Sequence, residues 1–361
     1  MVTAADHMRR ALFHARRSEG VTTPNPMVGA VVVTHEGVVV GYGRHPRAGE
    51  PHAEVFALHE AGDRARGATL YVTLEPCCHV GRTGPCTRRI VAAGVRKVVA
   101  AMQDPNPLVS GKGFEELRAA GIDVEIGLLG AEAARMNRAF AIVQAEARPM
   151  VIAKVAVSRD ARIAAAPGVR TQLTSGEANR RTQRLRASVD AVGVGSGTVL
   201  TDDPLLTVRD CYRFRPLVRV IFDRSLKTPP GARLFSTLDA GPVIILTTAT
   251  AAGRHTDSAH ALMRAGATLV EVPGDVRHDL RALLRFDIST LLLEGGATLH
   301  AAAWRAGVID RVHVIMAPIT LGEAGVKSFG GMELPMSELV PIKVDQLGPD
   351  QWMEADVHGH S

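Results

Sequence analysis

One short region of the sequence gathers side chains that can bind a metal ion. Cys77, Cys78 and Cys86 are three of only 4 cysteines in a chain of 361 residues, and His52 and Glu54 precede them. Cys77 follows a proline at the end of a β-rich run, whereas Cys86 follows a proline at the start of a helical pattern. If these groups meet at one ion, the fold must bring a strand end against helix starts. No other feature of the sequence constrains the fold as strongly.

The pattern predicts a catalytic zinc site. Such sites use three protein ligands and leave a fourth position to water or substrate. His52 and two of the three clustered cysteines could supply that set. A helix N-terminus favours the thiolate that binds metal, which supports Cys86. Cys78 is adjacent to Cys77 and should point elsewhere, so we expect Cys77 to be the other sulfur ligand.

Glu54 lies two residues after His52, in the first turn of the same predicted helix. That spacing lets a carboxylate reach a zinc-activated water, accept its proton and later donate a proton to a leaving amine. The arrangement matches the H-x-E…P-C-x-x-C signature of zinc nucleobase deaminases, except that Cys86 follows Cys77 by nine residues (86 − 77 = 9) rather than three. Two alternatives stay open. Buried free cysteines can be packing residues, and a structural zinc would take four protein ligands and leave Glu54 without a role.

Composition bounds the class of protein. Apolar residues make up 46% and charged residues 22% of the chain, and the length suits two globular domains. Aromatic residues are only 4%, and the net charge of +5, from 42 basic and 37 acidic residues, is scattered. These features favour a small anionic substrate over nucleic acid. The apolar runs are too short or too polar to span a bilayer, and the N-terminus is typical of an amphipathic helix rather than a signal peptide. We therefore expect a cytoplasmic protein.

Strand and helix patterns alternate along the whole chain, which indicates a layered α/β fold. In residues 1–146, two β-rich runs at 28–34 and 37–43 flank a turn signal and predict a hairpin. Helix and strand patterns then alternate to about residue 127. A linker near 145–150 precedes a second α/β domain, which we place at 147–361.

Four stretches resemble a known family. TTPNPMVGAVVV, GYGRHPRAGEPHAEVFAL, TLEPCCHVGRTGPCTRRI and MQDPNPLVSGKG are similar to the bifunctional deaminase–reductases of riboflavin biosynthesis. The resemblance covers nearly the whole chain and is most specific over residues 22–113. It implies a cytidine-deaminase-like layered α/β/α domain at 1–146, followed by a dihydrofolate-reductase-like α/β domain at 147–361. It also implies one zinc ion per chain, NADPH and a homo-oligomer.

For this family, the deaminase domain removes the 2-amino group of a ribosylated diaminopyrimidinone 5′-phosphate, and the reductase domain opens the ribose to a ribityl chain with NADPH. The resemblance implies zinc ligands at His52, Cys77 and Cys86, a proton shuttle at Glu54, and contacts to the pyrimidine or its sugar phosphate from Asn25, His45, His79 and Asn106. Asn25 and Asn106 lie in PNP turns, where an asparagine side chain can also serve the turn itself by hydrogen-bonding to nearby backbone.

The second domain lacks a full dinucleotide-binding fingerprint. Gly193, Gly195 and Gly197 follow a predicted strand but match the pattern only in part, and Asp223 lies 30 residues after Gly193 (223 − 193 = 30) instead of about 20. Because of these mismatches, we predict that this is not a Rossmann fold.

Two stretches instead resemble the family's reductase half: SGTVLTDDPLLTVR at 196–209 and LLLEGGATLHAAAW at 291–304. A strand that enters a helix through two glycines exposes backbone N–H groups, which suits a phosphate. The resemblance implies an NADPH site at Thr198, Asp202, Gly295, Gly296, Ala297, Thr298 and Leu299, a substrate site at Arg186, Leu206, Arg209 and Glu294, and Lys154 near the centre of hydride transfer. The arginines could fork onto the 5′-phosphate.

The chain departs from the family pattern in the second domain. Asp160-Ala161 replaces Asp-Gly, Arg170-Thr171-Gln172 replaces Ser-x-Trp, and Arg224 replaces a serine. Three rival readings follow from these departures and from the residues: the same deaminase with an altered or inactive reductase half in a related pathway, a nucleic-acid-editing deaminase, and a non-enzymatic nucleotide-binding module.

Overall fold

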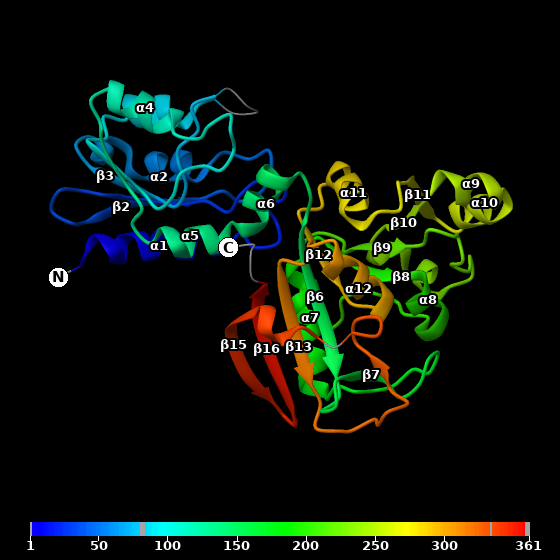
Figure 1. The fold of residues 1–361 in the computed structure, drawn as a ribbon. Helices are drawn as coiled ribbons and strands as arrows, with labels where there is room; N and C mark the ends of the chain where they lie inside the picture. Colours follow the sequence, from blue (N-terminus) through cyan, green and yellow to red (C-terminus); the bar gives the residue numbers. More distant parts are fainter. Residues whose placement is uncertain (1, 80–83, 333, 358–361) are drawn as a thin grey trace. The chain divides into compact units, whose positions relative to one another are not determined.

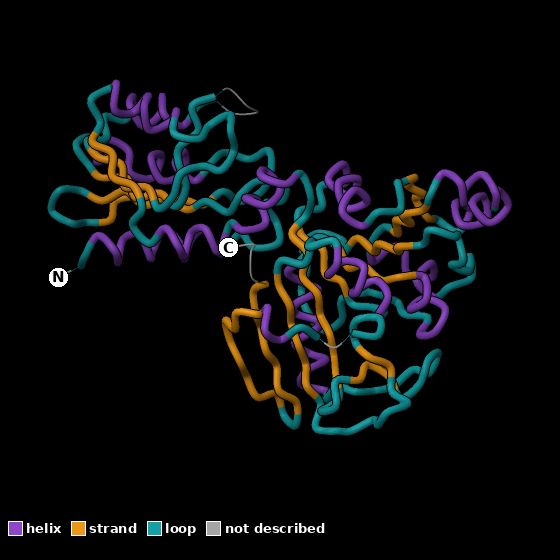
Figure 2. Tube along the Cα trace, in the orientation of Figure 1, coloured by secondary structure: helices purple, strands orange, loops and turns teal. Residues whose placement is uncertain are grey.

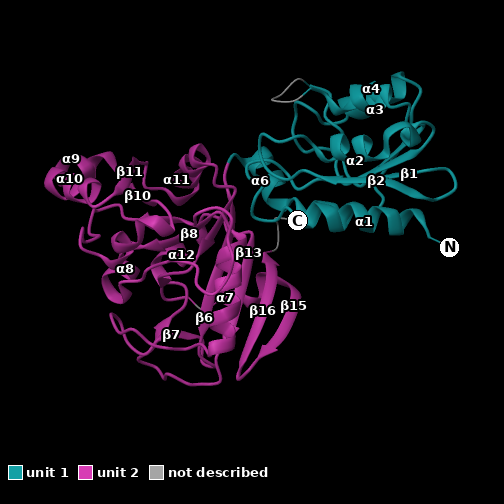
Figure 3. Cartoon of the chain, turned by 180° about the vertical axis from the view of Figure 1, so that it is seen from behind, with its two compact units in different colours: residues 1–147 teal, residues 148–361 magenta. Residues whose placement is uncertain are grey.

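The computed structural model describes residues 2–79, 84–332 and 334–357. It divides into two compact units, residues 1–147 and residues 148–361, which are described separately (Figure 3). The sequence pattern places the boundary after residue 146.

The first unit is a three-layer α/β/α domain built on a 5-stranded sheet of order β2-β1-β3-β4-β5. Strand β1 is antiparallel to β2 and β3, and β3, β4 and β5 are parallel. Figure 1 shows α1 and α5 on one side of this sheet and α2 and α4 on the other. Its elements are α1 (Ala4–Arg16), β1 (Gly29–Val33), β2 (Val39–Arg44), α2 (Ala53–Ala61), a 3₁₀ helix (Gly62–Ala65), β3 (Thr69–Val72), α3 (Cys86–Ala92), β4 (Lys97–Ala100), α4 (Lys112–Ala119), β5 (Asp123–Ile126), α5 (Gly130–Met136) and α6 (Arg138–Glu146).

Strand β1 is buried on both faces because helices cover both sides of the sheet. Ala30 and Val32 pack into the core beneath α2, whereas Val31 and Val33 pack against Met8 and other residues of α1. This explains why the sequence here is a continuous apolar run rather than an alternating one.

Two glycines of β2 bring α2 unusually close to the sheet. A Cβ on Gly43 would lie 2.2 Å from the carbonyl oxygen of Ala53, and one on Gly41 would lie 2.1 Å from that of Ala57. Only glycine allows this approach. The contact fixes the start of α2, where His52 and Glu54 lie.

The second unit is built on a 9-stranded sheet of order β11-β10-β9-β8-β12-β6-β13-β16-β15. Neighbouring strands from β11 to β13 are parallel, and β16 and β15 continue the sheet antiparallel. Figure 2 shows these strands in orange, running side by side. A separate two-stranded sheet pairs β7 with β14.

The second unit comprises β6 (Met150–Val157), β7 (Arg162–Ala164), α7 (Gly176–Ser188), β8 (Ala191–Gly195), α8 (Ser196–Asp202), β9 (Val218–Phe222), a 3₁₀ helix (Arg233–Ala240), β10 (Val243–Thr247), α9 (Ala249–Arg254), α10 (Thr256–Arg264), β11 (Ala267–Glu271), α11 (Val276–Arg281), a 3₁₀ helix (Ala282–Phe286), β12 (Thr290–Leu293), α12 (Ala297–Arg305), β13 (Arg311–Met316), β14 (Val326–Lys327), a 3₁₀ helix (Met336–Glu338), β15 (Leu339–Leu347) and β16 (Asp350–Val357).

A buried ion pair closes the central part of this unit. Both Arg148 Nη atoms donate to the carboxylate of Asp310, at 2.7 and 2.8 Å, and the amide of Val151 donates to the same carboxylate. Arg148 is 1% exposed and Asp310 is fully buried. The pair therefore fixes the chain that enters β6 against the segment before β13.

Within the described ranges, no helix has the length and apolar character needed to cross a membrane.

Candidate active sites

The structure brings His52, Cys77 and Cys86 together in the first unit. His52 is the N-cap of α2, Cys86 is the first residue of α3, and Cys77 follows β3. The His52 Nδ1 atom lies 3.4 Å from Cys77 Sγ and 3.3 Å from Cys86 Sγ, and the three ligand atoms all lie within 4.8 Å of one another. Tetrahedral zinc with ordinary Zn–S and Zn–N bonds would hold such atoms about 3.5 Å apart. The three residues therefore fit a zinc ion, and Cys78 lies outside the group.

Without a metal, the site favours loss of the proton from one of its two sulfurs. The hydrogen bond from Cys86, together with those from His52 and the Cys86 amide, lowers the pKa of Cys77 to about 4. The Cys86 amide lies 3.4 Å from Cys77 Sγ. The pKa of Cys86 is raised, because it hydrogen-bonds to Cys77 and because it is buried. One thiolate is thus already favoured without a metal, and a cation would favour the second.

Glu54 is buried beside this cluster. Glu54 is 3% exposed, and its Oε2 atom has no hydrogen-bond partner among the described residues. Burial raises the pKa of Glu54. Buried polar atoms are normally hydrogen-bonded, so this oxygen is suited to bind a water or a substrate group. A raised pKa suits a carboxyl group that both accepts and donates a proton.

A cavity of about 170 Å³ is lined by His52, Cys77 and Glu54. All four residues that the sequence pattern assigns to the pyrimidine or its sugar phosphate line it: Asn25, His45, His79 and Asn106. Asn106 also stabilises its own turn, because its Oδ1 atom accepts a hydrogen bond from the backbone N–H of Leu108 at 3.0 Å. His79 is exposed, whereas His45 is only 2% exposed.

Three further residues of this cavity were missed in the sequence. Glu75, which lies three residues after β3, accepts hydrogen bonds from four backbone amides, those of Asp104, Gly111, Gly113 and Phe114, and so fixes the loop that carries Asn106. Asp104 is 8% exposed, and burial raises its pKa to about 6. Both are acids at strand ends, a signal that could have found them. Phe140, on α6, also lines the cavity, and no sequence signal connects it to the site.

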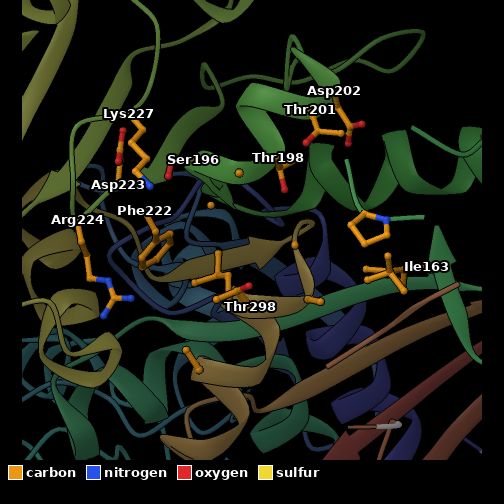
Figure 4. A pocket seen from close by; sticks show the side chains of 18 of the residues that line it. Ile163, Ser196, Thr198, Thr201, Asp202, Phe222, Asp223, Arg224, Lys227 and Thr298 are labelled. Atoms are coloured by element: carbon orange, nitrogen blue, oxygen red, sulfur yellow. The ribbon is translucent and has the colours of Figure 1, made fainter. Parts of the chain in front are cut away.

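The second unit contains a cavity of about 1000 Å³ (Figure 4). Two helix starts face it, α8 after β8 and α12 after β12, and these strands are neighbours in the sheet. Gly295 passes so close to Thr198 that a Cβ would lie 2.8 Å from Thr198 Oγ1, and Gly296 adopts φ = 77°. Most of the predicted NADPH residues line the cavity, namely Thr198, Asp202, Gly296, Ala297, Thr298 and Leu299.

Cations line this cavity. Arg170, Arg224, Lys227 and Arg305 are among its lining residues. In Figure 4, Arg224 and Lys227 lie at one end and Asp202 at the other, with Thr198 and Thr298 between them. Burial raises the pKa of Asp202, and Arg170 opposes the shift. Two of the departures from the family pattern, Arg170 and Arg224, thus add positive charge to a cavity of dinucleotide size.

The other departures lie elsewhere. Ala161 has φ = 60°, in the left-handed region where glycine is easier to accommodate, so the replacement of glycine places strain in this turn. Gln172 donates to the carbonyl of Thr174 and does not line the cavity.

A buried ion cluster adjoins the Gly295–Gly296 turn. Arg186 holds the carboxylate of Glu294 through Nε and through Nη2, the latter at 2.9 Å, and donates from Nη1 to the carbonyl of Thr207. Lys154 Nζ lies 3.6 Å from Glu294 Oε2. Burial opposes ionisation of Glu294, but Arg186 and Lys154 outweigh it and hold the pKa at about 2. Glu294 is therefore a carboxylate that keeps two cations in fixed positions.

The remaining predicted substrate residues lie on the segment that Arg186 supports. Leu206 is buried with φ = 54°, and the amide of Arg209 donates to Gln183 of α7 at 3.0 Å. The Arg209 side chain is exposed. Arg186, in contrast, is engaged by Glu294. Neither Lys154, Arg186, Leu206, Arg209 nor Glu294 lines the large cavity.

Comparisons with known proteins match both units. Residues 1–102 match the cytidine and deoxycytidylate deaminase zinc-binding region, and residues 149–352 match the RibD C-terminal domain. The chain is 39% identical over 355 residues to the riboflavin biosynthesis protein RibD of Aquifex aeolicus, which covers 96% of each protein.

Solved structures also align with nearly the whole chain. RibD of Acinetobacter baumannii aligns with a TM-score of 0.86 and 37% identity over 98% of each chain. A diaminohydroxyphosphoribosylaminopyrimidine deaminase/5-amino-6-(5-phosphoribosylamino)uracil reductase from Thermotoga maritima aligns with a TM-score of 0.85 and 33% identity, again over 98% of each chain.

Proposed function

Because the chain belongs to the RibD family and is a bifunctional deaminase and reductase of riboflavin biosynthesis, we propose which substrates, cofactors and residues each unit uses. The substrate of the first step is 2,5-diamino-6-(5-phosphoribosylamino)pyrimidin-4-one, which loses its 2-amino group to water. NADPH then reduces the ribosyl group of the product to a ribityl group. The observation that carries the first step is the close grouping of His52, Cys77 and Cys86 beside the buried Glu54.

In the deaminase unit, His52, Cys77 and Cys86 hold one zinc ion per chain. Bound there, zinc would supply an acidified water as the nucleophile at neutral pH. Glu54 accepts a proton in the cavity and delivers a proton to the departing amine. Its burial and its Oε2 atom without a partner support this role. Asn25, His45, His79 and Asn106 form the substrate side of the cavity, together with Asp104.

In the reductase unit, the cofactor lies across the two helix starts. The amides at the starts of α8 and α12, with Thr198 and the segment Gly295, Gly296, Ala297, Thr298 and Leu299, hold the pyrophosphate. Helix N-termini attract anions, and the absence of a Cβ at Gly295 lets the chain approach Thr198 closely. Asp202 contacts the end of the cofactor away from Arg224.

The substrate of the reductase unit lies beside the ion cluster. Lys154 is placed at the centre of hydride transfer and is kept there by its ion pair with the carboxylate of Glu294. Arg209 anchors the 5′-phosphate, and Leu206 packs on the substrate. Arg186 holds Glu294 and the 206–209 segment in place.

The cations at one end of the large cavity favour NADPH over NADH. Arg224 and Lys227 are exposed, and neither has an ion pair with any residue that the structure describes. NADPH carries a 2′-phosphate that NADH lacks, and guanidinium groups bind phosphate well. We assign this phosphate to Arg224 and Lys227. Under this assignment the replacement of the family's serine by Arg224 rebuilds the cofactor site and does not destroy it.

We also propose that the chain forms a homo-oligomer in the cytoplasm. Strand β15 lies at the edge of the sheet that the structure describes, so one of its sides has no partner strand. Its Val340, Ile342 and Val344 are 39–52% exposed, as expected for an apolar surface that a second copy of the chain covers. All four cysteines are free, which suits a reducing compartment. The substrates are small molecules, and neither nucleic acid nor a membrane is a partner.

The products test both steps. The protein is incubated with the diaminopyrimidinone ribosyl phosphate, with and without NADPH, and the products are identified by mass spectrometry. We expect the deaminated compound alone without NADPH, and its ribityl form when NADPH is present. Deamination without any NADPH oxidation would favour the alternative, a deaminase with an inactive reductase half.

A further inference from the structure

His45 lies at the wall of the deaminase cavity, but its ring does not face the cavity with a free nitrogen. It follows β2 directly, is 2% exposed and packs edge-on against the His52 ring, with the centroids 5.4 Å apart. Its Nδ1 atom lies 3.1 Å from the carbonyl oxygen of Pro51, and its Nε2 atom lies 3.0 Å from Nδ2 of Asn25. Both ring nitrogens are thus engaged inside the protein.

The partners of His45 decide which nitrogen carries the proton. A carbonyl oxygen can only accept, so Nδ1 of His45 must be the donor to Pro51. The carboxamide nitrogen of Asn25 can only donate, so the Nε2 atom that it faces at 3.0 Å carries no proton and is an acceptor. The group that approaches Nε2 must donate, and Nδ2 of Asn25 is that donor.

This hydrogen bond sets the direction of the Asn25 carboxamide. The backbone N–H of Asn25 donates to the carbonyl of Thr22 at 2.8 Å, which fixes the backbone at this residue. With Nδ2 turned to His45, the Oδ1 atom on the other side of the planar carboxamide is free, because no hydrogen bond from the described residues reaches it. Asn25 lines the cavity together with His52 and Glu54. The cavity therefore receives a fixed hydrogen-bond acceptor near the metal ligands.

We propose that His45 is a positioning residue, which orients Asn25 so that Oδ1 accepts a hydrogen bond from a ring N–H of the pyrimidinone substrate. This inference rests on the deaminase function proposed above and deepens it. Oδ1 of Asn25 would select a ring that has a lactam N–H beside the reacting carbon. A ring with an unprotonated nitrogen at that position would bind less well, because this nitrogen and Oδ1 of Asn25 are both acceptors. The family resemblance implies a direct contact from His45, whereas in this proposal His45 acts on the substrate through Asn25.

A double-mutant cycle separates this role from direct contact. Deamination and zinc content are measured for Asn25→Ala, His45→Leu and the double variant, and calorimetry gives the affinity of each for the deaminated product. We expect each single change to lower kcat/KM by roughly 10- to 100-fold, mainly through KM, with a parallel loss of product affinity and zinc retained. In the Asn25→Ala background, His45→Leu should add almost nothing, because its effect passes through Asn25.

A conservative variant and a matched control complete the test. Glutamine, like neutral histidine, offers one acceptor and one donor, so His45→Gln should recover most of the product affinity that His45→Leu loses. His7→Leu removes another buried histidine of the same unit, one whose Nδ1 has no partner among the described residues, and should change neither KM nor product affinity.

Additive effects in the cycle would overturn the inference, because they would mean that His45 contacts the ligand itself. Loss of zinc from His45→Leu would overturn it as well, by assigning His45 to support of His52. If the unaltered protein does not deaminate the pyrimidinone at all, the proposed function fails, and that result is distinct from either outcome of the cycle.

Discussion

The two candidate sites hold their polar groups in opposite ways. In the deaminase unit the decisive groups are buried and close together: Cys86 is fully buried, Glu54 is 3% exposed, and the cavity is about 170 Å³. In the reductase unit the cavity is about 1000 Å³, and the cations Arg224 and Lys227 at one end of it are exposed. The first site is fixed by packing, and the second is shaped largely by exposed charge.

This difference explains where the chain departs from its family pattern. Partly or fully buried side chains that meet at 3.3–3.4 Å leave no room for a residue of another size, and the deaminase motifs match throughout. Exposed cations around a wide cavity can be gained or moved at little cost to packing, and Arg170 and Arg224 lie there. A change of sequence at the second site therefore shifts affinity, whereas one at the first removes function.

The largest effect should come from the metal ligands. Cys77→Ser and Cys86→Ser should each lose zinc and all measurable deamination, because a catalytic zinc needs its three protein ligands. Reduction of the deaminated product with NADPH should continue. Zinc is measured by metal analysis of the purified variants. Cys78→Ser is the matched control, and zinc loss there with retention in Cys77→Ser would reverse the ligand assignment.

Glu54→Gln should keep zinc and lose proton transfer. Glutamine fills nearly the same space but cannot carry the proton, so kcat for deamination should fall by about 10²- to 10⁴-fold. Steady-state kinetics on the variant with a metal analysis of the same sample decides this. Near-normal turnover with bound zinc would show that another group moves the proton.

The independence of the units can be tested through the buried pair of the second unit. Asp310→Ala leaves the buried Arg148 guanidinium without that carboxylate, and should lower the free energy of unfolding by about 3–5 kcal/mol. Both tryptophans of the chain, Trp304 and Trp352, belong to this unit, so their fluorescence during denaturant unfolding reports on it alone. Zinc content and deamination should stay unchanged. A parallel loss of zinc would show that the two units do not fold independently.

The smallest effect should come from the exposed cations. Arg224→Ala should weaken NADPH binding by about 10-fold, roughly 1.4 kcal/mol, and leave NADH binding nearly unchanged, because only NADPH has the 2′-phosphate. Lys227→Ala should act in the same direction. Both are measured by titration of the two nucleotides, with Arg264→Ala, an exposed arginine away from the cavity, as the control. Equal weakening of NADPH and NADH would remove this role from Arg224.

The two-domain α/β fold, the family and the bifunctional activity were predicted from the sequence and are confirmed. The predicted hairpin at 28–43 is also confirmed, since β1 and β2 pair antiparallel. These features could be read because their signals are local. Apolar runs identify the strands, and the candidate metal ligands all lie within residues 52–86.

Other features could not be read because their partners are distant or their signals weak. Glu294 and Arg186 are 108 residues apart, and no sequence pattern around either residue indicates that the two form an ion pair. The C-terminal hairpin of β15 and β16 was not predicted, because Pro341 weakens the strand signal of the alternating Val340, Ile342 and Val344 in β15. The orientation of Asn25 likewise depends on the tautomer of a histidine 20 residues away.

Removal of zinc tests the central claim most directly, namely that one chain carries a metal-dependent deaminase and a separate metal-independent reductase. The protein is depleted of metal with a chelator, and both steps are assayed on the same sample, deamination of the diaminopyrimidinone and NADPH oxidation with the deaminated product. We predict that deamination disappears and returns when zinc is added back, while the reduction rate stays the same throughout. Deamination that persists without metal, or reduction that is lost with it, would contradict the account.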